Sequence, residues 1–143
     1  MRKEDAERTA RFLRKWEERL RLQHYTIDYQ FHQYAQELPS EVAEGQCLAG
    51  RACTWPEVER AQIDVLADGQ DAPATFYGRH ELCHVLLAPL GHVLMMLEDQ
   101  VAPPVFAVVR QAFEEAEERV VRRLDDVFEE FEPLLSDDEE QSP

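Results

Sequence analysis

The chain has 143 residues, which is enough for one domain with a hydrophobic core and too few to predict two. Apolar residues make up 44% of it and charged residues 31%, a composition that excludes wholesale disorder. The formal net charge of -15 disfavours direct binding to nucleic acid, because nucleic-acid-binding proteins carry an excess of Lys and Arg. With no apolar run long enough for a signal peptide or a membrane span, we expect a cytoplasmic protein without membrane contact.

The first half of the chain predicts one helix followed by three strands. Apolar residues recur at helical spacing over residues 4–22, which predicts an amphipathic helix with Trp16 in the core. The period changes to two over residues 25–31 and again over residues 61–67, which predicts two half-buried strands. A weaker strand is predicted between them, over residues 47–54.

The second half of the chain predicts helices. Asp71 is suited to cap a helix over residues 72–88, which Pro89 is expected to end. A short helical segment is predicted over residues 93–98. After a proline break, a stripe of apolar residues at helical spacing predicts a long helix over residues 105–132.

This order of elements predicts an α+β domain with its helices against one face of a small antiparallel sheet of about three strands. The domain is predicted to cover residues 1–133. Residues 134–143 are strongly acidic, and we expect them to form a disordered tail.

The sequence His80-Glu81-Leu82-Cys83-His84 matches the H-E-x-x-H pattern and falls inside a predicted helix. Residues four apart on a helix lie one above the other, so two imidazoles at this spacing can bind one zinc ion. Glu81 then projects beside the pair, where it can act as the general base toward water activated by the metal.

A catalytic zinc site normally needs a third protein ligand. The metzincin pattern would supply a later histidine, but Leu87 and Leu90 stand where its glycine and third histidine would be, and His92 is two residues too late. The other common solution takes a glutamate from a later helix. The predicted helix over residues 105–132 offers four close together: Glu114, Glu115, Glu117 and Glu118.

Helical phase favours Glu117 among these four. It lies between Phe113 and Val121 at four-residue spacing, within the apolar stripe that faces the core. A carboxylate there is costly to bury unless a partner such as a metal ion compensates its charge.

The other three glutamates fit a metal site less well. Glu118 and Glu115 are each followed four residues later by an arginine (Arg122 and Arg119), which is typical of surface ion pairs. Glu114 lies near the edge of the stripe and is the second choice. The third ligand is therefore predicted as Glu117, with Glu114 and Glu118 left open.

Cys83, Tyr77 and Arg79 lie close to the motif and invite functional interpretations. A small buried thiol that fills space beside the helix is a better reading of Cys83 than a third metal ligand. For Tyr77 and Arg79, a surface or boundary position is expected in preference to stabilising an oxyanion.

A combination of features resembles the small zincin-like metallopeptidases of the gluzincin type, and is particularly similar to minimal versions encoded by phages and prophages. The resemblance covers roughly residues 4–125, and HELCH is its specific motif. The features are Trp16 on a first helix, alternating strands at 25–31 and 61–67, HELCHVLLAPL at 80–90 and EERVVRRL at 117–124.

The resemblance implies zinc bound by His80, His84 and a glutamate of EERVVRRL, with Glu81 as the catalytic base. Glu117 matches the family pattern because an apolar residue, Val121, stands four positions later. The resemblance also implies an edge strand that binds a peptide or protein substrate as an added strand.

We therefore predict a zinc-dependent metallopeptidase that hydrolyses peptide bonds by Glu-assisted attack of a zinc-bound water. Two alternatives come from other classes of protein. One is a zincin-fold binding module with little or no catalysis, and the other is an acidic protein that mimics DNA, suggested by the charge of -15. The sequence carries no signal for the oligomeric state.

Overall fold

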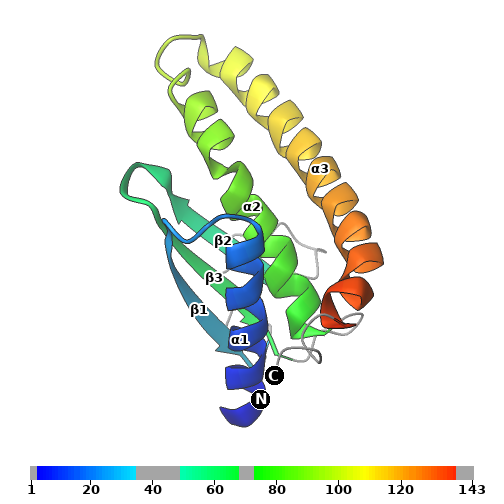
Figure 1. Ribbon diagram of the computed structural model, residues 1–143. Helices are drawn as coiled ribbons and strands as arrows, with labels where there is room; N and C mark the ends of the chain where they lie inside the picture. Colours follow the sequence, from blue (N-terminus) through cyan, green and yellow to red (C-terminus); the bar gives the residue numbers. More distant parts are fainter. Residues whose placement is uncertain (1–2, 35–48, 68–72, 138–143) are drawn as a thin grey trace.

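A computed structural model of the chain describes residues 3–34, 49–67 and 73–137. Within these residues it has three α-helices, one short 3₁₀ helix and a three-stranded sheet, so the predicted α+β class is confirmed (Figure 1). In chain order the elements are α1 (Lys3–Arg19), β1 (Thr26–His32), β2 (Gly50–Trp55), η2 (Pro56–Val58), β3 (Arg60–Leu66), α2 (Ala74–Met95) and α3 (Pro103–Asp137).

Some predictions fall outside the described residues or at their limit. The predicted start of the second strand at Cys47 and the predicted helix cap Asp71 both lie outside them. Helix α3 continues to Asp137, past the predicted domain boundary at residue 133, and the rest of the acidic tail is not described.

The sheet is mixed, with the strand order β1-β3-β2. Strands β2 and β3 are antiparallel and are joined by the short turn of η2, with Ala52 opposite Ile63. Strand β1 pairs with β3 in parallel, with Tyr29 opposite Ile63, so the prediction of a purely antiparallel sheet is wrong. The physical reason is that β3 lies between β1 and β2, so these consecutive strands do not pair as an antiparallel hairpin, and β1 pairs instead with β3.

One face of the sheet is apolar and is covered by helices. The apolar positions predicted for the two strands are confirmed, since Ile27, Ile63 and Val65 are all buried on this face. Strand β3 is not half-buried, because Asp64 and Leu66 on its other face are buried as well. Helices α1 and α2 lie against this side of the sheet, and α3 packs along the far side of α2 (Figure 1). Helix α2 is therefore the central element, in contact with the sheet and with both other helices.

Helix α1 closes one end of the core. Trp16 is buried as predicted, and its ring lies 4.8 Å from the ring of Phe128 on α3. Leu13 is also buried and meets α2 at Gly78, where the two helices come very close together.

Because of this close approach, Gly78→Ala is expected to destabilise the fold by about 1–3 kcal/mol. An added Cβ would lie 2.6 Å from Cδ1 of the buried Leu13, so one of the two helices must shift. Thermal or urea unfolding measures the change. Gly91→Ala on the same helix is the control, because its Cβ would lie 3.8 Å from Phe113, an ordinary contact. An equal effect of both substitutions would contradict this explanation.

Helix α2 does not end at Pro89 but continues to Met95, which merges it with part of the short helix predicted over residues 93–98. A proline removes one backbone hydrogen bond and bends a helix, but packing can maintain the helix beyond it. Here Leu94 of α2 and Phe106 of α3 are both buried beyond the proline. Among the described residues, no helix combines the length and apolarity needed to cross a bilayer.

Candidate metal centre

Helix α2 presents the two histidines of the HELCH motif toward α3. His80 and His84 lie one turn apart, and the centroids of their rings are 5.1 Å apart. Both side chains are partly buried in the space between the two helices. The predicted helical spacing of the two imidazoles is therefore confirmed.

Three side chains bring possible metal ligands together: His80, His84 and Glu118. Their donor atoms all lie within 4.8 Å of one another. Nε2 of His84 is 3.4 Å from Oε2 of Glu118, and Nε2 of His80 is 3.7 Å from Oε1 of the same carboxylate. Ligands at zinc distances of ~2.0–2.1 Å in a tetrahedral site are about 3.4 Å apart. This group could hold a metal ion.

The other nitrogen of each ring is held by a second carboxylate. Nδ1 of His80 lies 2.6 Å from Oδ2 of Asp125, and Nδ1 of His84 lies 2.8 Å from Oε1 of Glu117. Because a carboxylate only accepts, each ring carries its proton on Nδ1 in this arrangement. With Nδ1 donating, each neutral ring can offer the lone pair of Nε2 on the side of Glu118, which is the tautomer that a metal requires.

Glu117, the glutamate favoured by helical phase, reaches the site but is not in the group of three donors. Its carboxylate is the partner of Nδ1 of His84, on the opposite side of the ring from the space that His80, His84 and Glu118 share. Glu118 makes the predicted ion pair with Arg122, at 3.0 Å, yet its carboxylate also faces both histidines. Glu114, the second choice, pairs with Arg110 at 2.9 Å.

Arg79 and Asp125 form a buried pair behind His80 that the sequence analysis did not identify. Arg79 is 2% exposed, so the prediction of a surface or boundary position for it is wrong. Its guanidinium lies over the rings of Trp16 and Phe76 and contacts Glu132 at 3.0 Å. Asp125 is 3% exposed and bridges Arg79 and His80.

A weak signal for this pair is present in the sequence. Asp125 stands seven residues after Glu118 and four after the buried Val121, which places all three on neighbouring turns of one helix face. Nothing local indicates which residue compensates the charge of Asp125, because Arg79 comes from a different helix.

Glu81 lies under strand β2, beside the candidate metal-binding group. It is 8% exposed, and the backbone of Ala52 donates a hydrogen bond to its carboxylate. A Cβ at Gly50 would lie 2.9 Å from Oε1 of Glu81, so any larger residue there would force the carboxylate to shift. Burial raises the pKa of Glu81, while the neighbouring His84 and His80 oppose that rise.

Burial and charge act in opposite directions on His84. Burial by itself lowers the pKa of the imidazole, but the hydrogen bond to Glu117 and the negative charges of Glu81, Glu117 and Glu118 raise it above the usual value. The carboxylates around this ring favour a positive charge there, whether that of a protonated imidazole or that of a metal ion.

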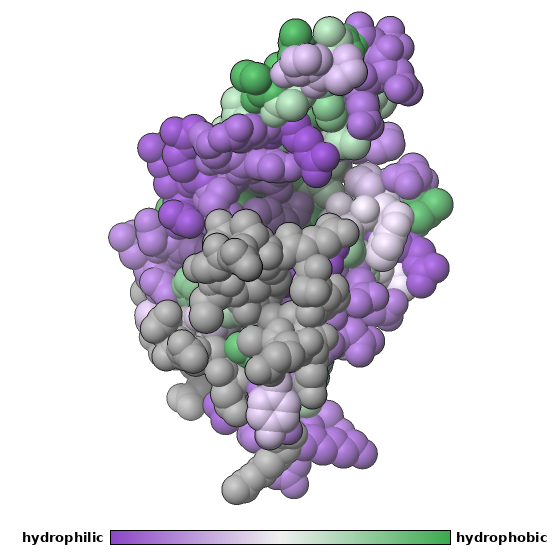
Figure 2. Space-filling view, turned by 180° about the vertical axis from the view of Figure 1, so that it is seen from behind, coloured by the Kyte–Doolittle hydropathy of each residue, from purple (hydrophilic) through white to green (hydrophobic). Residues whose placement is uncertain are grey.

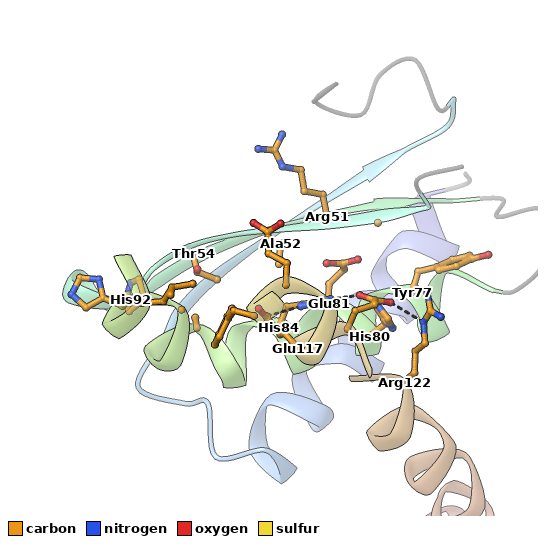
Figure 3. A pocket seen from close by; sticks show the side chains of 18 of the residues that line it. Arg51, Ala52, Thr54, Tyr77, His80, Glu81, His84, His92, Glu117 and Arg122 are labelled. Carbon is orange, nitrogen blue, oxygen red and sulfur yellow. Dashed lines mark hydrogen bonds and ion pairs between the residues drawn. The ribbon is translucent and has the colours of Figure 1, made fainter. Parts of the chain in front are cut away.

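The site opens into a cleft of about 1090 Å³ between β2, α2 and α3. Figure 3 shows Glu81 beneath Ala52 of β2, and His80 and His84 beside the α3 side chains. Tyr77 also lines the cleft. Cys83 is fully buried, as predicted, and burial raises the pKa of its thiol to about 12, so it is a neutral packing group.

Comparisons with protein-family models, curated proteins and solved structures gave no match to this chain.

Proposed function

We propose that this chain is a zinc-dependent metallopeptidase whose metal ligands are His80, His84 and Glu118. The observation that carries the proposal is the convergence of two Nε2 atoms on one carboxylate, while both Nδ1 atoms are held by other carboxylates. Two imidazoles and one carboxylate are a ligand set that zinc accepts in catalytic sites, with room for water as the fourth ligand.

When bound, a zinc ion supplies Lewis-acid activation of water and polarisation of a carbonyl oxygen. Glu81 is the group of this chain that is placed to accept the proton of the attacking water and deliver it to the leaving amine. Its buried position favours the protonated carboxyl that the second step requires.

Among the described residues β2 is an edge strand of the sheet, and this position supports a peptide as the substrate. Leu66 N–H bonds to the carbonyl of Ala49, so the alternating pattern of an antiparallel pair turns the backbone groups of Gly50, Ala52 and Thr54 away from β3. These three residues line the cleft beside the candidate metal centre. The N–H of Ala52 already donates to Glu81, so an extended peptide would pair as an added strand through the outward backbone groups of Gly50 and Thr54 and the carbonyl of Ala52.

The test of the catalytic role is Glu81→Gln. We expect hydrolysis of a peptide library to fall by about 10²–10⁴-fold, because the general acid and base is lost while the metal ligands remain. Zinc content by atomic emission should stay equal to that of the wild type. Full activity in the variant would disprove the role of Glu81, and zinc without any cleavage by the wild type would favour a binding module.

Zinc affinity is expected to fall as the pH falls through the raised pKa of His84, because the metal binds only the neutral ring. The window begins above the usual histidine value of about 6.5, and the limiting slope is about tenfold per pH unit for one proton released. In the metal-free protein, the effect of pH on the stability of the fold has the opposite sign. There the shift stabilises the fold below about pH 6.5, and this contribution is lost as the pH rises through the folded-state pKa.

A competition titration with a chelator between pH 6 and 8.5 measures this dependence. Glu117→Gln removes a negative charge from His84 and should move the fall in affinity to lower pH. An unchanged midpoint in that variant would contradict the assignment of the shift to Glu117.

A further inference from the structure

Exposed apolar side chains gather at one end of the molecule. There α2 and α3 form a helical hairpin that extends beyond the sheet (Figure 1), and Figure 2 shows hydrophobic residues clustered at that end. Ten exposed large apolar residues lie in this hairpin: Leu86, Leu90, Val93, Met95, Met96, Leu97, Val101, Val105, Val108 and Val109. A concentration of this kind on a protein surface marks an interaction site.

Eight residues of the hairpin form two exposed stripes with the same spacing, which we call the apolar seams. Steps of four, three and four residues separate their members, which is the spacing of helices that pack in bundles and coiled coils. The seam of α2 consists of Leu86, Leu90, Val93 and Leu97, of which Leu97 follows the end of the helix. The seam of α3 consists of Val101, Val105, Val108 and Ala112, of which Val101 precedes the start of the helix.

Both seams lie on the same side of the hairpin. Gly91 of α2 faces Phe113 of α3, so these residues mark the directions in which the helices face each other. At 3.6 residues per turn, the seam members that lie within α2 and α3 are rotated from that direction by about 80–160° in the same sense. When two antiparallel helices face each other, residues rotated by the same angle and in the same sense about their own helix axes point to the same side of the pair. Ala88, which lines the cleft, is rotated in the opposite sense, so the seams face away from the cleft.

The seams carry no charged side chains. Residues 82–97 contain no Asp, Glu, Lys or Arg, and neither do residues 101–109, in a chain of which 31% is charged. The net charge of -15 therefore lies elsewhere, and it opposes association through this face less than through any other. The same net charge disfavours an anionic membrane surface as the occupant.

We propose that the apolar seams bind a second copy of this chain, so that two hairpins related by a two-fold axis form a four-helix bundle. A hairpin with two parallel seams on one side is self-complementary, as an isologous interface requires. The seams span residues 86–97 and 101–112, twelve residues each. The eight seam residues would form the centre of such an interface, to which each partner of a stable complex contributes roughly 20–30 residues. The clefts remain open on the outer sides of the dimer.

The test measures the mass of the full chain in solution at micromolar to submillimolar concentrations, by sedimentation equilibrium. The wild type should have twice the 16.7 kDa mass of the chain. Val105→Glu with Val108→Glu should raise the dissociation constant at least about a hundredfold, because the charges would be buried in the interface. Both side chains are exposed in the single chain, so circular dichroism should show an unchanged fold.

Val120→Glu with Val127→Glu is the matched control, since both are exposed valines of α3 outside the seams. This variant should remain a dimer. A wild type that stays monomeric at all these concentrations overturns the proposal, and so does a dimer that only the control variant disrupts. Binding of a monomeric wild type to anionic lipid vesicles, lost on Val105→Glu with Val108→Glu, would assign the face to a membrane instead. None of these outcomes depends on zinc or on hydrolysis.

Discussion

Replacing Glu118 by glutamine is expected to abolish stoichiometric zinc binding and, with it, all hydrolysis. Glu118 contributes the carboxylate that lies 3.4 Å and 3.7 Å from the Nε2 atoms of His84 and His80. Without it only two ligands remain, fewer than a catalytic zinc site uses. Metal content after dialysis, together with a chelator titration, measures the loss, and His84→Ala provides a reference for a missing ligand.

Glu117→Gln is the decisive comparison, because the same change is made at the neighbouring residue. Glu117 is hydrogen-bonded to Nδ1 of His84, the ring nitrogen that does not face the metal site. Its loss should therefore weaken zinc affinity by about 10–100-fold without abolishing binding. Glu114→Gln, at a residue paired with Arg110, should have no effect. Loss of zinc in the Glu117 variant but not in the Glu118 variant would show that Glu117, the residue favoured by helical phase, is the third ligand.

The part of this site that the sequence predicts is local. His80, Glu81 and His84 share one helical turn, so their relative placement follows from helix geometry alone. The third position depends on how α3 is rotated against α2. Glu117 and Glu118 are neighbours about 100° apart on the helix, and both reach His84, Glu117 at Nδ1 and Glu118 at Nε2. The apolar stripe in the sequence shows which side of α3 faces the core, but it cannot distinguish between two neighbouring glutamates on that side.

The same distinction applies to the fold. The alternation of Ile27 and of Ile63 with polar residues is local, and the structure places both on the buried face of the sheet. The order of the strands is not local, because β3 inserts between its two predecessors in the chain. The continuation of α2 past Pro89 is likewise decided by packing, since α2 packs against α3 and Leu94, beyond the proline, is buried.

Asp125→Ala is expected to destabilise the fold by about 1–3 kcal/mol and to weaken zinc binding at the same time. Asp125 is the buried carboxylate closest to the Arg79 guanidinium on one side and is hydrogen-bonded to Nδ1 of His80 on the other. Its removal leaves the cation of Arg79 with less compensation in the core and frees the ring of His80 to adopt the other tautomer. Urea unfolding of the metal-free protein measures the first effect, and a chelator titration measures the second.

Two further variants separate the effects of charge and hydrogen bonding. Asp125→Asn keeps a side-chain oxygen that can accept from Nδ1 of His80 but removes the charge that faces Arg79, so it should lose more stability than zinc affinity. Arg79→Met combined with Asp125→Leu replaces the buried pair by apolar groups and should recover stability relative to Asp125→Ala, while zinc binding stays weak. If Asp125→Ala left both stability and zinc affinity unchanged, then Asp125 would neither compensate Arg79 nor orient His80.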